Sequence, residues 1–286
     1  MDDIRLPLIV PYFPTIFLSF SLWTILQYVA APIISQQMVG RQEWKVMSAR
    51  TRNLWATHIV SMAHALLAVP LALRCLNIPT LDADRAFAWD AQAGGLYAIA
   101  AGYFLWDTVE SLVHYEDPGF IVHGVACLGI YTLAFRPFLG YYGARFLLWE
   151  MSTPFLNIHW FLDKMGRTGT TLQLVNGIAL LSTFACVRLL YGGLMSYRFF
   201  VTLREVYHEI PLLFTFTYGV GNVVLQSLNW FWFGKMISAL RKRFDKPPTS
   251  KRSRTNGTTV TNGNGNSRRS SGARTQNGRV TSRSAR

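Results

Sequence analysis

The sequence predicts an all-α protein: a polytopic transmembrane bundle of about seven spans around a polar-lined cavity, followed by a disordered C-terminal tail. Three observations predict this fold. Half of the residues are apolar, and they are grouped in blocks long enough to cross a bilayer. Several of these blocks carry polar side chains at helical spacing, and the chain after Phe244 is polar and basic.

Five apolar blocks contain no Asp, Glu, Lys or Arg and have about the 20 residues that a membrane span requires. They are residues 6–40, 53–73, 118–135, 168–187 and 210–234. Two further blocks are apolar apart from two charged residues each: 91–113 contains Asp107 and Glu110, and 142–162 contains Arg145 and Glu150. Together these blocks make up the predicted spans.

The links between the spans predict the orientation of the chain. Link 41–52 is basic and contains Trp44, which is typical of an interfacial segment, and basic residues also follow the fifth and seventh spans at 164–167 and 235–243. Link 77–90 is acidic. Because basic loops stay in the cytosol, we expect a lumenal or external N-terminus and a cytosolic C-terminus.

Pro154 lies inside the fifth span, four residues after Glu150. A proline has no backbone N–H, so it leaves a carbonyl without its helical partner and tends to kink the helix. We expect this kink to widen the space beside Glu150.

The tail carries ten Lys or Arg residues against the single Asp245, so most of the net charge of +13 lies in it. Such a segment buries too little apolar surface to fold, which predicts a disordered cytosolic extension. A more specific alternative is that the tail binds anionic lipid headgroups. Nucleic acid is not an expected partner, because no aromatic residues are interleaved with the charges. The chain then divides into a first span with its basic link (1–49), a membrane domain (50–243) and the tail (244–286).

The three cysteines, Cys75, Cys127 and Cys186, each lie inside or at the edge of an apolar block. They form no Cys/His pattern with metal-ligand spacing, and thiols at membrane depth behave as small apolar groups. We therefore expect neither a metal nor a cofactor.

Four spans carry a row of polar side chains along one helix face. The rows are Thr57, Ser61 and His64; Asp107, Glu110 and His114; Glu150 and Asn157; and Asn222, Gln226 and Asn229. Polar groups at membrane depth must face each other or a wet interior. We interpret the amide and hydroxyl rows as hydrogen bonds between helices, and the acidic groups as the lining of a cavity.

His123, near the start of the fourth span, allows two interpretations. It is either a neutral imidazole bonded to a neighbouring helix, or a group that faces the cavity beside a carboxylate and moves protons. The residues predicted to line the cavity and bind a lipid are His64, Asp107, Glu110, His123, Glu150 and Asn157. Among these, His123, Asp107 and Glu150 are the candidate catalytic residues.

Three segments resemble successive signatures of the TLC-domain family: GYFLWDTVESL (102–112), FIVHGVACLGIY (120–131) and FLLWEMSTPFLNIHWFLDK (146–164). The resemblance covers residues 50–243 and is closest to the small branch of the family that is linked to membrane lipid composition rather than to ceramide synthesis. It implies a bundle of inclined helices around a lipid-sized cavity. It also implies the endoplasmic reticulum membrane as the compartment, with the plasma membrane as the alternative.

Two departures from the ceramide synthases weigh against the same reaction. Those enzymes carry paired histidines, one of which is associated with acyl transfer, and an Asp-x-x-Asp pair. The corresponding positions here are His123-Gly124 and Glu150-x-x-Thr153. We therefore expect a non-catalytic protein that binds or regulates membrane lipids. The alternatives are an acyltransferase that uses His123, and an escort for other membrane proteins, as in the translocon-associated member of the family.

Overall fold

Helices make up the part of the chain that the structure describes. The structure is a computed structural model that describes residues 6–244, and this range contains no strand. The predicted all-α class is confirmed. The predicted tail after Phe244, with its disorder and its headgroup contacts, lies outside the described residues.

The helices of residues 6–244 join into seven rods, with the remaining short helices in the links. The first rod consists of α1 (Phe13–Ile25), η2 (Leu26–Ala30) and α2 (Ala31–Val39); the next three are α4 (Ala49–Arg74), α6 (Ala91–Val113) and α7 (Pro118–Leu133). The fifth rod consists of α8 (Gly140–Leu147), η3 (Leu148–Ser152) and α9 (Thr153–Lys164); the sixth of α10 (Thr171–Phe184), η4 (Ala185–Tyr191) and α11 (Gly192–Val206); and the last is α12 (Leu212–Phe244). η1 (Val10–Tyr12) directly precedes α1 and is continuous with the first rod, and the links hold α3 (Arg41–Val46) and α5 (Pro79–Ala83).

Three rods within the described range are long and apolar enough to cross a membrane: Val10–Val39, Ala49–Arg74 and Thr171–Val206. Large apolar side chains on these rods are exposed, among them Phe17, Leu66 and Leu190. Soluble proteins rarely expose apolar surface of this extent, whereas the hydrocarbon of a bilayer accommodates it. That all seven rods cross the bilayer stays a prediction.

Side chains in the links start several rods by accepting hydrogen bonds from the first turn of the helix. Ser48 accepts from the backbone N–H of Thr51 and starts α4, and Asp90 accepts from the N–H groups of Gln92 and Ala93 and starts α6. Asp117 caps α7 in the same way, and Pro118 occupies its first turn. Each cap satisfies backbone donors that have no helical partner.

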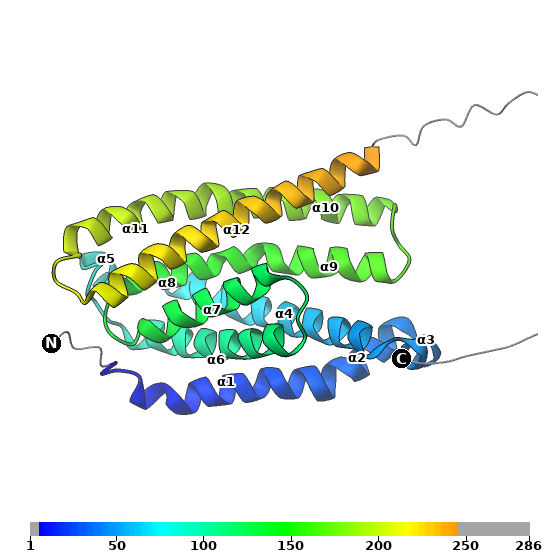
Figure 1. Cartoon of the computed structure of the whole chain (residues 1–286), viewed down its shortest axis with the longest axis horizontal. Helices are drawn as coiled ribbons and strands as arrows, with labels where there is room; N and C mark the ends of the chain where they lie inside the picture. Colours follow the sequence, from blue (N-terminus) through cyan, green and yellow to red (C-terminus); the bar gives the residue numbers. More distant parts are fainter. Residues whose placement is uncertain (1–5, 245–286) are drawn as a thin grey trace, which may run out of the picture. The chain divides into compact units, whose positions relative to one another are not determined.

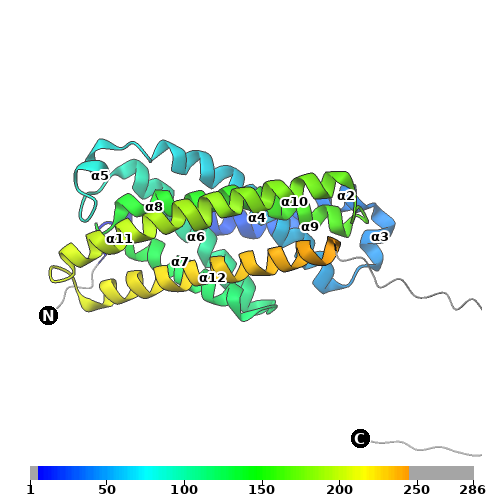
Figure 2. The ribbon, with the colours of Figure 1, turned by 90° about the horizontal axis from the view of Figure 1, so that it is seen from above.

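The rods run side by side, and α6 packs against α1, α4, α7 and α8 (Figures 1 and 2). Glycine allows the closest of these approaches. A Cβ atom at Gly102 of α6 would lie 2.5 Å from the carbonyl oxygen of Ile16 and from Cβ of Ser19, both on α1. The tight contact between α1 and α6 therefore depends on a residue without a side chain.

The basic segments gather at one end of the bundle. The link containing α3, the link between α9 and α10, and the C-terminal end of α12 lie at the right in Figures 1 and 2, whereas α5 and the link between α11 and α12 lie at the left. The sequence predicts that these basic segments share one membrane face, and they share one end of the bundle here. That this face is cytosolic stays a prediction.

Three rods depart from regular α-helix. η2 and η4 are π-helical, and η3 is a 3-10 segment that ends at Ser152, two residues before Pro154. Pro154 accounts for η3, because its nitrogen cannot donate to the carbonyl of Glu150. The sixth rod also corrects the predicted span 168–187. The helix does not end at Arg188 but continues through it to Val206.

Candidate functional site

A cavity of about 540 Å³ lies between the helices, and we call it the polar chamber. Five of the six predicted cavity residues line it: Asp107, Glu110, His123, Glu150 and Asn157. The wall also reaches Glu116 and Lys235, towards the end of the bundle that carries the basic links. Its volume lies within the range of about 300–1,000 Å³ that is usual for small-molecule sites.

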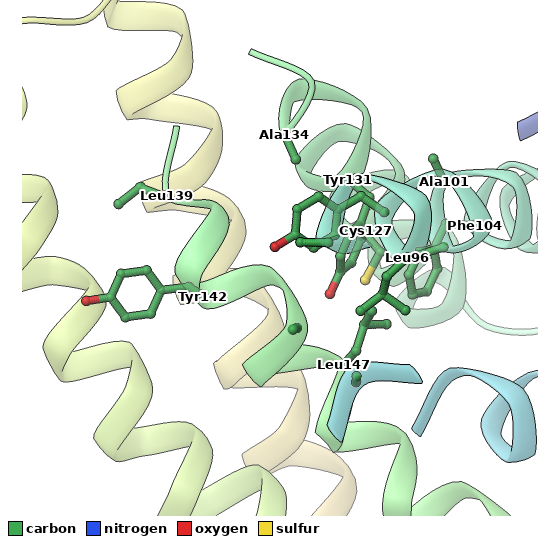
Figure 3. Packing of buried hydrophobic residues seen from close by; sticks show 14 of the residues in the cluster. Leu96, Ala101, Phe104, Cys127, Tyr131, Ala134, Leu139, Tyr142 and Leu147 are labelled. Carbon is green, nitrogen blue, oxygen red and sulfur yellow. The ribbon is translucent and has the colours of Figure 1, made fainter. Parts of the chain in front are cut away.

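A second, narrower cavity of about 50 Å³ adjoins the polar chamber, and we call it the apolar slot. Its walls are mostly apolar, and Figure 3 shows part of them, including Phe104 of α6 and Cys127 and Tyr131 of α7. Three ionisable residues belong to the walls of both cavities: His123, Glu150 and Arg188. A polar space and an apolar space therefore meet at these three side chains.

Arg188, in η4, is the buried cation of the site. Its Nη2 lies 3.8 Å from Oε1 of Glu150, and both side chains are about nine-tenths buried, with 8% and 11% of their surface exposed. The other Glu150 oxygen accepts from the Thr153 hydroxyl at 2.7 Å. The remaining guanidinium donors bond to oxygens of neighbouring helices: Trp149 O at 3.1 Å, Ser152 Oγ at 3.0 Å and Asn229 Oδ1 at 3.2 Å.

Sequence reasoning missed Arg188 because the sixth span was taken to end at the first charged residue. The signal was present, since the sequence is apolar on both sides of Arg188 and the helix extends over 36 residues. An ionisable residue with apolar sequence on both sides is the same signal that identified Asp107 and Glu150.

Two residues of the polar row of α12 form hydrogen bonds with Arg188. Asn229 accepts from its guanidinium, and Gln226 donates to its backbone carbonyl at 3.1 Å. Asn222 lines the apolar slot. Two members of the row thus form contacts between helices, as interpreted from the sequence.

Asp107 faces the polar chamber without a hydrogen bond or ion pair to any described residue. Its helix lies close to α7. A Cβ atom at Gly124 would lie 3.0 Å from Oδ2 of Asp107 and 2.9 Å from Oγ1 of Thr108. A second histidine beside His123, at position 124, would therefore require these side chains to move.

Glu110, in contrast, has several partners. It accepts hydrogen bonds from the side-chain amides of Gln27, at 2.7 Å, and Asn53, and its other contact is His114 Nδ1 at 3.0 Å. Trp106 donates to the Gln27 carbonyl oxygen at 2.9 Å. Glu110 thus joins the first rod, α4 and α6 while also lining the chamber.

Asn157 joins α4 to α9. Its Oδ1 lies 2.7 Å from Nδ1 of His58, and its Nδ2 donates to Oγ of Ser61 at 3.3 Å. The His58 ring stacks on Trp160, with 4.0 Å between the ring centroids. His58 lines the polar chamber, although sequence reasoning assigned it no role. Its spacing from Ser61, three residues along the same helix, was the available signal.

His64 was predicted to line the cavity, but the structure places it away from both the polar chamber and the apolar slot. Its side chain is fully buried and stacks on Tyr103, with 3.5 Å between the ring centroids. The edges of Trp23 and Phe104 complete the surrounding wall. The imidazole packs here as an aromatic ring of the core.

His123 lines both cavities, but its contacts are aromatic and sulfur groups. Its ring lies 5.6 Å from Trp232 and 6.0 Å from Phe104, and Cys127 Sγ lies 3.9 Å from its Nε2. No carboxylate within residues 6–244 forms a hydrogen bond or ion pair with it; the basic partner of Glu150 is Arg188. The pairing with a carboxylate, which one of the two interpretations of His123 requires, is therefore not seen in this part of the chain.

The sequence is similar to several known proteins over most of its length. The sequence profile described as the TLC domain matches residues 54–238. An uncharacterised TLC domain-containing protein of Schizosaccharomyces pombe is 38% identical over 217 residues, covering 75% of this chain and 74% of that protein. Topoisomerase I damage affected protein 4 of Saccharomyces cerevisiae is 28% identical, covering 85% and 90% of the two chains. TLC domain-containing protein 4 of Homo sapiens is 28% identical, covering 66% and 75%.

Proposed function

Because this chain belongs to the TLC-domain family, we propose that it binds a membrane lipid inside its helix bundle and influences membrane lipid composition without transforming the lipid. The observation that carries this proposal is the meeting of the polar chamber and the apolar slot at His123, Glu150 and Arg188. A lipid has the same two parts, a polar head and an apolar chain.

The size of the polar chamber supports a ligand. A cavity of about 540 Å³ lies within the range of about 300–1,000 Å³ that small-molecule sites usually have. Ionisable groups at membrane depth cost several kcal/mol unless they face a partner or a polar cavity. The chamber supplies that polar surrounding, and a lipid head group would occupy it.

The acyltransferase alternative has less support from the geometry. A general base requires an imidazole whose orientation is set by a hydrogen-bonding partner. His123 is surrounded by Phe104, Trp232 and Cys127 instead. A second histidine at position 124, as in the ceramide synthases, would also require the Asp107 and Thr108 side chains to move.

The escort alternative interprets the polar groups as contacts between helices alone. The networks around Glu110 and Asn157 do serve as such contacts. Asp107 does not, because it faces the chamber without a partner among the described residues. An unpaired carboxylate in a chamber of this size favours ligand binding over a purely structural role.

We also propose the endoplasmic reticulum membrane as the compartment and a cytosolic C-terminus. The family resemblance supports the compartment. The gathering of the basic links at one end of the bundle supports the orientation, because basic segments stay on the cytosolic side.

Lipid binding is tested by filling the chamber. Ser111 lines it, so Ser111→Trp should expel most of the lipid that co-purifies with the wild-type chain, as measured by mass spectrometry. Ser227, on the exposed face of α12, provides the matched control, and Ser227→Trp should retain the lipid. A wild-type protein without co-purified lipid, or equal lipid content in the two variants, contradicts the proposal.

The non-catalytic part of the proposal is tested with His123→Ala. Cells producing this variant at wild-type abundance should show no accumulated acyl-transfer substrate and no missing product in their lipid profile. Loss of a lipid product at unchanged abundance would favour the acyltransferase alternative.

A further inference from the structure

We propose that the polar chamber selects lipid head groups that donate hydrogen bonds, and that His58 is the residue that accepts them. This inference rests on the proposed lipid binding and adds the chemical class of the head group. The groups that donate are ammonium N–H and hydroxyl O–H.

The first step is the orientation of the imidazole. Asn157 donates through Nδ2 to Ser61, so its Oδ1 is the atom that faces His58 Nδ1 at 2.7 Å. An amide oxygen only accepts, so Nδ1 of His58 carries the hydrogen. In a neutral imidazole the other nitrogen then has the lone pair, which makes Nε2 an acceptor.

The second step is that the acceptor is held in place and accessible. Stacking on Trp160, with an angle of 20° between the ring planes, fixes the plane of the imidazole. His58 lines the polar chamber, and its Nε2 has no hydrogen-bond partner among the described residues. It is not among the fully buried unpaired atoms, whereas both nitrogens of His64 are. A ligand in the chamber can therefore reach Nε2 of His58.

The third step is the balance of donors and acceptors in the wall. The Asp107 carboxylate is a second acceptor that lines the chamber without a partner among residues 6–244. The charged donors are engaged: Arg188 by Glu150 and the oxygens around it, and Lys235 by Asp117 at 3.7 Å. The chamber therefore offers acceptors to a ligand, and a ligand that donates satisfies them.

Because the chamber offers acceptors, its affinity for two common head groups should differ. Phosphoethanolamine and phosphocholine carry the same charges, but only the ethanolamine nitrogen has hydrogens to donate. Charge attraction to Asp107 alone would bind both head groups equally. A hydrogen bond to His58 Nε2 requires an N–H group, which only phosphoethanolamine has. A hydroxyl head, as in diacylglycerol, would satisfy the same acceptor without a charge.

The test uses the full chain in nanodiscs and competition between lipids with identical acyl chains, read by native mass spectrometry. We expect phosphatidylethanolamine to bind about two- to twelvefold more tightly than phosphatidylcholine, as one net hydrogen bond of about 0.5–1.5 kcal/mol implies. A diacylglycerol arm distinguishes a hydroxyl donor from an ammonium donor.

The variants assign the preference to His58. His58→Phe keeps the stacking on Trp160 but removes the acceptor, so the preference should disappear while lipid still binds. In Asn157→Asp the carboxylate still accepts a hydrogen bond from His58 Nδ1, so the preference for phosphatidylethanolamine should remain. In Asn157→Leu no acceptor faces His58 Nδ1, so the preference should be lost. The control is His208→Phe, at an exposed position in the link before α12, which should leave the preference unchanged.

Three results overturn the inference. Equal binding of the two phospholipids by the wild-type chain removes the selection while leaving lipid binding intact. A preference that survives in both His58→Phe and Asn157→Leu removes His58 from it. If the wild-type chain binds no lipid of any head group, the proposed function fails together with the inference.

Discussion

At the scale of single residues, Arg188 and Glu150 form an ion pair that is buried inside the bundle. Each is buried, and each is the nearest opposite charge of the other. Removing one partner of a buried pair leaves an uncompensated charge, whereas removing both together leaves a neutral site. The pair therefore behaves as a unit rather than as two separate contributions.

Arg188→Met should lower the free energy of unfolding by about 3–5 kcal/mol, because Glu150 is then buried without its cation. The double variant Glu150→Gln with Arg188→Met should recover part of this loss. Thermal unfolding of the purified single and double variants in detergent measures both effects. Additive losses would show that the two side chains do not form a coupled pair.

Gly124→Ala should destabilise the protein by about 1–3 kcal/mol, since the added methyl group of α7 meets Thr108 and Asp107 of α6. Gly95→Ala is the matched control, because no atom lies within 4 Å of a Cβ placed there. It should leave stability unchanged or raise it by up to about 1 kcal/mol. A Gly124→Ala variant as stable as Gly95→Ala would mean that the helices are not packed as described.

The sequence predicts single residues well where an ionisable side chain interrupts apolar sequence. Asp107 and Glu150 were identified on that ground, Asn157 by its place in the polar row of Glu150, and the structure places all three in the chamber wall. The hydrogen-bonding partners of these side chains could not be predicted from the sequence. The contact of Glu110 with Gln27 joins residues 83 positions apart, and no local pattern encodes such a distance.

At the scale of elements, Arg145 of α8 holds the link before α6 against the bundle. Its guanidinium donates to the carbonyls of Tyr141 and Leu76, each at 2.7 Å, and to Asp82 at 3.2 Å. It also lies over the Tyr141 ring, 3.3 Å from its centroid. The contacts to Leu76 and Asp82 fasten the segment that contains α5.

Arg145→Met should release this segment, because the carbonyl of Leu76 and the carboxylate of Asp82 lose their buried donor. We expect faster hydrogen exchange at residues 76–83 and a loss of stability of about 2 kcal/mol. Arg85→Met is the control, since Arg85 is exposed and touches only the face of the Tyr141 ring at 4.9 Å. Unchanged exchange at residues 76–83 in Arg145→Met would contradict this role.

Element boundaries were predictable where a cap marks them, and irregular turns were not. Pro118 and the turn before it mark the start of α7 in the sequence as in the structure. The 3-10 segment before Pro154 follows from the missing donor of that proline. The π-helical segments η2 and η4 carry Gln27 and Arg188, yet their sequences contain no proline or glycine that would indicate them.

At the scale of the whole molecule, the basic links predict a single orientation. We expect N-glycosylation acceptor sequences inserted at residues 77–90 to be modified, because this acidic link lies at the end opposite the basic ones. Insertions in the link between α9 and α10 should remain unmodified. The reverse pattern, measured as a shift in electrophoretic mobility, would place the C-terminus on the lumenal side.

The class of the molecule was predictable from composition, since apolar blocks of span length leave few other folds. The cavity was predictable only as an expectation, because rows of polar side chains are equally compatible with hydrogen bonds between helices. Both outcomes occur here: Asn157 and Glu110 bond across helices, whereas Asp107 faces the chamber. Whether a given polar row faces the chamber or bonds to another helix depends on the rotation of its helix about its axis. A sequence pattern does not specify that rotation.

Lipid binding in the chamber is tested most directly by an experimental density map of the protein purified from membranes. We expect elongated density that fills the polar chamber and passes His123, Glu150 and Arg188 towards the apolar slot. A collapsed chamber, with Asp107 bonded to a neighbouring helix and no density between the rods, would contradict it.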